Sequence, residues 1–162
     1  MIRLATEFDI TAILDMAQEF WVHTQFSEPF DRDHTRGMVE MSISQGLMVV
    51  ADDGEVFGFI SAIKSPLLGS PFAQMATELA WWVNPAKRGK MVGVNLIRFL
   101  ERLCIEQEVR YLNLAFMETS MPKQVEKMYL KLGYTLQETV YTKVLYGSSN
   151  SSGGGGRSSS LQ

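Results

Sequence analysis

A strand that runs through a glycine-containing turn into a long amphipathic helix most restricts how this chain can fold. The hydrophobic pattern predicts the strand at 73–83, a stop at Pro85 and the helix at 88–106. The first amides of such a helix and the positive end of its dipole converge on one point, which Arg88 and Lys90 make more basic. This arrangement suits a pyrophosphate. An ordinary strand-to-helix turn with exposed basic residues is the alternative, and the spacing alone does not separate the two.

The other elements follow from alternating and helical patterns of apolar residues. An Asp-Gly pair at 53–54 marks a hairpin turn between two apolar runs. Strands are expected at 2–5, 47–51, 56–64 and 111–116, with two closing strands within 135–146, and helices are expected after Asp9, at 32–44 and at 123–132. The order β-α-α-β-β-β-α-β-α-β-β predicts a mixed α/β (α+β) fold, in which helices flank a mostly antiparallel central sheet.

Length and composition favour one globular domain. The chain has 162 residues, of which 46% are hydrophobic, and we assign the domain to 1–146. The Gly/Ser-rich stretch 147–162 has few side chains to bury and is typical of an engineered linker or expression scar, with a natural flexible tail as the alternative.

Charge and targeting features indicate which partners and which cellular location to expect. The formal net charge is −3 and no Lys/Arg-rich run is present, so nucleic acid is an unlikely partner. No apolar run is long enough for a membrane span, and the N-terminus does not read as a signal peptide. The single cysteine, Cys104, lies on the apolar stripe of the long helix and is expected to be core. A cytoplasmic location is the expectation.

The turn also carries a recognisable motif. The run Val83-x-Pro85-x-x-Arg88-Gly89-x-x-x-Gly93 resembles the acetyl-CoA signature of the GNAT superfamily of N-acetyltransferases. The resemblance implies that the turn holds the CoA pyrophosphate and that the preceding strand pairs with the pantetheine. The cofactor-binding residues implied are Trp81, Trp82, Val83, Arg88, Gly89, Lys90, Met91, Val92, Gly93 and Asn95. Met91 stands where the family has its middle glycine, so its side chain could crowd the phosphate.

A second run, from Val125 to Tyr134, resembles the family's Ala-x-x-x-Tyr-x-x-x-Gly-Phe segment. The resemblance implies that Tyr129 is the general acid that protonates the departing CoA thiolate. Its helical position beside the stripe of Val125, Met128 and Leu132 predicts a hydroxyl that faces a cleft, and a boundary tyrosine with a wet hydroxyl is the alternative. Upstream, Pro122 replaces an asparagine common in the family.

Glu78 is the candidate general base. Strand alternation predicts that Glu78, Ala80 and Trp82 share one face, where apolar neighbours would raise the pKa of the carboxyl group. The family often has a glutamate on this strand, which supports the assignment. A structural hydrogen bond or a solvated strand end is the alternative.

An acceptor groove is expected, by resemblance, between the first two helices, their connection and the loop before the 73–83 strand. Its candidate substrate-binding residues are aromatic, which suits an amine on an apolar body: Trp21, Phe26, Phe30 and Phe72. Simple packing of the helices is the alternative for each one. His23 and His34 lack metal-ligand spacing, so no metal is expected.

The resulting hypothesis is an enzyme that transfers the acetyl group of acetyl-CoA to a primary amine of a small molecule, peptide or protein. A catalytically weak or inactive CoA-binding or protein-interaction module of the same fold is the alternative, which Met91 and Pro122 favour. The closing segment could pair or swap between two copies, so a homodimer is also compatible with the sequence.

Overall fold

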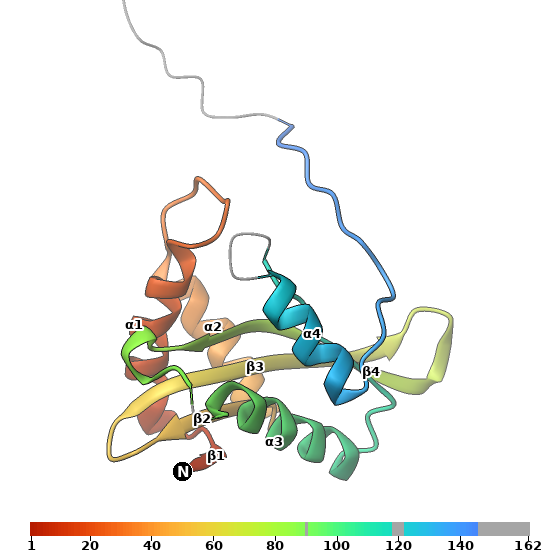
Figure 1. The fold of residues 1–162 in the computed structure, drawn as a ribbon, viewed down its shortest axis with the longest axis horizontal. Coiled ribbons are helices and arrows are strands. Elements are labelled where there is room, and N and C mark those ends of the chain that lie inside the picture. Colours follow the sequence, from red (N-terminus) through yellow and green to blue (C-terminus); the bar gives the residue numbers. More distant parts are fainter. Residues whose placement is uncertain (90, 118–121, 146–162) are drawn as a thin grey trace, which may run out of the picture.

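The computed structural model describes residues 1–89, 91–117 and 122–145. Lys90 and the tail 147–162, both subjects of the sequence predictions, lie outside the described residues. The elements in chain order are β1 Ile2–Leu4, a 3₁₀ turn Glu7–Asp9, α1 Ile10–Trp21, α2 Arg32–Ser44, β2 Met48–Asp52, β3 Val56–Leu67, β4 Ser70–Val83, a 3₁₀ turn Pro85–Lys87, α3 Val92–Glu106, β5 Tyr111–Asn113 and α4 Pro122–Leu132 (Figure 1).

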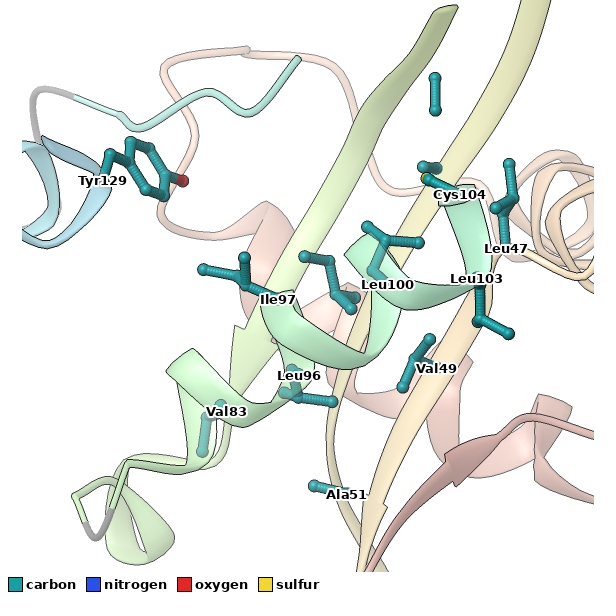
Figure 2. Packing of buried hydrophobic residues seen from close by; sticks show 13 residues of the cluster. Leu47, Val49, Ala51, Val83, Leu96, Ile97, Leu100, Leu103, Cys104 and Tyr129 are labelled. Atoms are coloured by element: carbon teal, nitrogen blue, oxygen red, sulfur yellow. The ribbon is translucent and has the colours of Figure 1, made fainter. Parts of the chain in front are cut away.

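One sheet in the order β1-β2-β3-β4-β5 organises the molecule. Its first four strands are antiparallel, and β5 pairs with β4 in parallel. Helices α1 and α2 bury their apolar side chains against one face, around Phe59 and Trp82. Helices α3 and α4 cover the other face, where Leu96, Ile97 and Leu100 of α3 pack on β2 and β3 (Figure 2). The predicted fold class, a mostly antiparallel sheet flanked by helices, is confirmed.

Asp9 connects the first elements through its charge. It stands at the N-cap position of α1 but makes no side-chain cap bond there. Its carboxylate instead accepts hydrogen bonds from the Arg3 guanidinium at 2.7 and 2.8 Å and from the Thr6 amide at 2.7 Å. The Arg3 bonds, opposed by burial and helped by Thr6, lower the pKa of Asp9 to about 2. Arg3 also reaches Asp52, so the group ties β1 to the start of α1 and to β2.

An extra residue in β4 changes which residues share a face. Ser61 lies opposite Ala80 while the next residue, Ala62, lies opposite Glu78, so Leu79 bulges out of the ladder. Directly opposed residues share a face, and Ala62 belongs to the α3–α4 side. Glu78 therefore lies on the face of α3 and α4. The prediction that it shares a face with Ala80 and Trp82 is wrong, because one inserted residue reverses strand parity.

Three predicted boundaries also differ. The helix expected at 88–106 begins at Val92, because Gly89 and Met91 have positive φ angles of 107° and 64°. The loop expected at 65–71 shrinks to a tight turn, since β3 extends to Leu67 and β4 starts at Ser70.

The two closing strands expected within 135–146 are absent from the described residues 135–145, which are exposed and without regular structure. These residues leave the end of α4 and run clear of the sheet, as the blue trace in Figure 1 shows. With no strand beside them, their backbone groups have no ladder to join.

Candidate active site

Strands β4 and β5 separate before β4 ends. They pair only from Met75 to Thr77 on β4 and from Tyr111 to Asn113 on β5, whereas β4 continues to Val83. The resulting wedge opens beside the start of α3. A pocket of about 160 Å³ occupies it. Seven of its lining residues are predicted cofactor residues: Trp81, Trp82, Val83, Arg88, Gly89, Val92 and Gly93. The other three, Phe20, Met117 and Val125, were not predicted as site residues.

The start of α3 is shaped to receive an anion. Met91 occupies the N-cap position and makes no side-chain cap bond, while the Val92 amide donates to the Gly89 carbonyl at 3.0 Å. Gly89 and Met91 both take up positive φ, which turns the chain sharply into the helix. The Met91 side chain is 58% exposed. These features fit a CoA diphosphate, because unpaired amides and the helix dipole both favour negative charge at this point.

Arg88 is held across the end of β4. Its Nε donates to the Val83 carbonyl at 3.0 Å, and its guanidinium carbon lies 4.7 Å from the centre of the Trp82 ring. The guanidinium keeps donors that these contacts do not use, since it carries five N–H groups. Arg88 therefore adds positive charge at the mouth of the wedge while its position is fixed from β4.

A single backbone residue joins the two candidate catalytic side chains. The Ala115 amide donates to a carboxylate oxygen of Glu78 at 2.9 Å, and the Tyr129 hydroxyl donates to the Ala115 carbonyl at 2.7 Å. Ala115 lies two residues beyond β5, on the side of the wedge opposite β4. The structure thus brings the two candidates, Glu78 from β4 and Tyr129 from α4, together through a residue that sequence reasoning missed.

Both groups have shifted acidity. Burial raises the pKa of Glu78 to about 7, against the opposing effect of the Ala115 amide bond. Burial, and secondly the charge of Glu78, raises the pKa of Tyr129. A carboxylate that titrates near neutrality and a phenol that stays protonated form a suitable base and acid for proton transfers at neutral pH.

Tyr129 is more buried than its sequence position indicated. It is the buried residue of α4, with 7% of its surface exposed, whereas Val125, Met128 and Leu132 are only partly buried. The prediction that it lies beside the core stripe is therefore wrong, because α4 turns this residue toward the sheet. Figure 2 shows its ring reaching from α4 toward the strands. The centroid of the Tyr129 ring lies 6.5 Å from that of the Trp81 ring.

The two tryptophans of β4 each carry a buried indole N–H that has no hydrogen-bond partner among the residues the structure describes. Trp81 faces α3 so closely that a Cβ added to Gly93 would lie 2.5 Å from its Cζ2 atom. Trp82 faces the opposite side, where His23 stacks on it at 5.1 Å and Phe20 meets it edge-on at 6.2 Å. Both residues line the pocket in the wedge.

The predicted acceptor residues separate into two places. Trp21 stacks on Phe26 at 5.5 Å and lies 6.4 Å from Phe30, which makes one aromatic cluster at the connection between α1 and α2. Phe72 does not join it: it is 96% exposed near the β3–β4 turn. Ten residues of extended strand separate Phe72 from Trp82, a distance of roughly 33 Å. Among the predicted cofactor residues, Met91 and Asn95 do not line the pocket.

Within the ranges 1–89, 91–117 and 122–145, no three His, Cys, Asp or Glu side chains are placed to hold a metal ion. No helix in the described part of the chain is long and apolar enough to cross a bilayer. The sequence could not single out Ala115, because it contributes only backbone atoms. Phe20 follows the apolar helical spacing of the first helix, and that spacing predicts a core residue and not a site residue.

A mostly antiparallel sheet that opens beside the start of α3, with two side chains of raised pKa at the opening, defines a mixed α/β protein with a ligand-sized pocket between its strands. The chain belongs to the acetyltransferase (GNAT) family, whose model matches residues 10–134. The resemblance seen in the sequence is thereby confirmed, and with it the enzyme class, an acetyl-CoA-dependent N-acetyltransferase.

Solved structures share this fold at low sequence identity. A transcriptional regulator from Bacillus halodurans C-125 is 19% identical, with a TM-score of 0.71 over 90% of this chain and 99% of its own. AAC(6')-Iy in complex with a bisubstrate analog, CoA-S-monomethyl-acetylneamine, is 17% identical, with a TM-score of 0.67 over 91% and 98%. A ribosomal-protein-alanine N-acetyltransferase from Brucella melitensis biovar Abortus 2308 is 17% identical, with a TM-score of 0.67 over 90% and 99%. No curated protein sequence matches the chain.

Proposed function

We propose that this protein transfers the acetyl group of acetyl-CoA directly to a primary amine, with Glu78 as general base and Tyr129 as general acid. The proposal rests on two hydrogen bonds of Ala115, whose amide and carbonyl hold the two side chains at the opening between β4 and β5. The start of α3 holds the diphosphate, and the thioester lies in the wedge beside Trp81.

The reaction requires two proton transfers. The amine nitrogen attacks the thioester carbonyl carbon, a C–N bond forms and the C–S bond breaks. Glu78 takes the proton that the amine loses, directly or through one water, and its pKa of about 7 leaves it able to do so at neutral pH. Tyr129 gives its proton to the departing thiolate, for which its hydroxyl must turn from the Ala115 carbonyl toward the sulfur.

The acceptor enters the opening between β4 and β5 from the side of α1 and α2, and its amine reaches through that opening to Glu78 on the opposite face. The cluster of Trp21, Phe26 and Phe30 borders that side, and Phe20 and Trp82 line the wedge itself. Aromatic faces suit an amine that is carried on an apolar or aromatic body. Among the family's relatives, AAC(6')-Iy was solved with an acetylneamine analog and another structure is a ribosomal-protein-alanine acetyltransferase, so aminoglycosides and peptide N-termini both belong in a test panel.

Two observations favour an active enzyme over an inactive module. Met91 keeps its side chain 58% exposed and takes up the left-handed conformation that a glycine would adopt. Pro122 begins α4, a position where proline costs a helix little.

Release of free thiol from acetyl-CoA across a panel of small amines, peptides and aminoglycosides tests the proposal. We expect turnover with at least one class, and Tyr129→Phe should lower kcat by ~10²–10⁴. Tyr134→Phe is the matched control, because Tyr134 is also buried in part and donates to a glutamate, Glu101 at 2.8 Å, outside the wedge. Equal turnover in wild type and Tyr129→Phe would remove the assigned acid, and no turnover with any amine would contradict the function.

A further inference from the structure

The opening between β4 and β5 connects the two faces of the sheet. Trp81 packs with the core under α3 and α4, whereas Trp82 and Phe20 pack with the core under α1 and α2. All three residues line the same pocket. A group that enters from the side of α1 and α2 can therefore pass between the strands to the side of α3 and α4.

Glu78 lies at the narrow end of this opening. The last paired residues of the two strands are Thr77 and Asn113. Just beyond them the Ala115 amide donates to the Glu78 carboxylate at 2.9 Å. Paired strands lie roughly 4.8 Å apart, so the gap begins near this width beside Glu78 and widens toward the end of β4. An amine that gives its proton directly to Glu78 must place its nitrogen at this narrow end.

Two aromatic rings border the opening on the side of α1 and α2. Phe20, in the last turn of α1, meets the Trp82 ring edge-on, with 6.2 Å between the ring centroids. The Trp82 ring is in turn held by the Arg88 guanidinium, whose carbon lies 4.7 Å from the ring centre, and by the His23 ring at 5.1 Å. Phe20 is itself partly buried. Neither ring can turn aside without losing these contacts, so the passage has a fixed width.

We propose that this passage selects primary amines carried on an unbranched carbon, –CH2–NH2, and that Phe20 enforces the selection. The inference rests on the proposed function, because it requires Glu78 as the base. When the nitrogen lies beside Glu78, the carbon that bears it lies between the strands. A methylene at this place has the width of an extended chain, whereas a branch on the same carbon would meet the Phe20 ring.

The selection follows from where the bonds form. The amine nitrogen bonds to the thioester carbon, the C–S bond breaks, the amine proton goes to Glu78, and Tyr129 gives a proton to the thiolate. The lysine side chain and other alkylamines satisfy this geometry. The α-amino group of a peptide stands on a branched carbon, unless the residue is glycine, and is disfavoured.

Benzylamine and α-methylbenzylamine form the first test, because they differ by one methyl group on the carbon that bears the nitrogen. kcat/KM is measured for each amine with acetyl-CoA. The ratio of the two values is divided by that of the uncatalysed reactions of the same amines with acetyl-CoA, which removes the intrinsic effect of the branch. We expect the enzyme to prefer benzylamine by about tenfold or more beyond the uncatalysed ratio. A ratio equal to the uncatalysed one overturns the inference.

The panel of acceptor amines gives a second reading. The amine with the highest kcat/KM should stand on a CH2 carbon, so that Nα-acetyl-lysine amide exceeds a peptide whose only amine is its N-terminus. A best acceptor whose amine stands on a branched carbon overturns the inference. Turnover without the preference overturns this inference alone, whereas no turnover with any amine overturns the proposed function and this inference with it.

Phe20→Ala tests the assigned residue. Removal of the ring should bring the benzylamine ratio to within about threefold of the uncatalysed one, and Phe20→Leu, which keeps more of the packing, should lower the ratio in the same direction. Phe57→Ala is the matched control, because Phe57 is also partly buried but does not line the pocket, and its ratio should stay that of the wild type. Each ratio is taken within one protein, so a general loss of folding or activity does not change it. An unchanged ratio in both Phe20 variants overturns the role of Phe20.

Discussion

Met91 has a backbone conformation that methionine rarely adopts, with φ 64° and ψ 13°. The left-handed region costs a residue with a Cβ about 1–2 kcal/mol relative to glycine. The strain lies at the turn that the proposed function assigns to the CoA diphosphate. The backbone at this position thus has the left-handed conformation that glycine favours, although the residue is a methionine.

Replacing Met91 by glycine should stabilise the protein by about 1 kcal/mol and leave acetyl-CoA affinity unchanged or tighter, because the strain is removed while the amide stays in place. Thermal unfolding with and without acetyl-CoA measures both effects. Glu108→Gly is the matched control, since Glu108 has φ 57° at the far end of α3 and should give a similar gain with no effect on affinity. A weaker affinity in Met91→Gly would mean that the thioether itself contacts the ligand.

The packing of α3 on β4 is the contact between elements that shapes the wedge. Gly93 in the first turn of α3 lies against the Trp81 ring, and no larger residue fits there without movement. The close approach brings the start of α3 beside the end of β4. The signature glycine at this position is therefore explained by packing as well as by space for a phosphate.

Gly93→Ala should displace the Trp81 ring, since the new Cβ would lie 2.5 Å from Cζ2. We expect a loss of about 1–3 kcal/mol in unfolding free energy and weaker acetyl-CoA binding. Gly37→Ala is the control, because a Cβ on Gly37 in α2 meets nothing within 4 Å, and it should gain about 0.5–1 kcal/mol. Unfolding in denaturant and titration with acetyl-CoA measure the pair, and an unaltered Gly93→Ala protein would contradict the packing account.

The elements show where sequence reasoning succeeds. Long periodic patterns predicted α2 with both of its bounds and α1 with its start after Asp9, because their apolar stripes repeat over three turns. The bulge at Leu79 left no such mark, since a single extra residue changes parity without changing composition. The sequence therefore placed Glu78 on the correct strand but on the wrong face of the sheet.

The two edge strands of the sheet, β1 and β5, differ in how they are held. The edge at β1 is tied down by the ion pairs of Arg3 with Asp9 and Asp52. Among the described residues no strand pairs with the outer side of β5, and residues 135–145 lie outside the sheet. The sequence predicted two closing strands within 135–146, and the described residues 135–145 form none. Local composition can favour a strand, but a strand also needs a neighbouring edge to pair with, which composition does not show.

The pH dependence of acetyl transfer with and without Glu78 tests the central claim most directly. A base with a pKa of about 7 is ionised above that pH, so kcat should fall as the pH drops through 7, and the raised pKa of Tyr129 keeps the acid protonated on the alkaline side. Glu78→Gln should lower kcat by ~10²–10⁴ and abolish the fall near pH 7. Any dependence on the pKa of the free amine should appear in kcat/KM of both proteins. A wild-type profile that is flat through pH 7, or one that Glu78→Gln reproduces at full rate, would contradict the account.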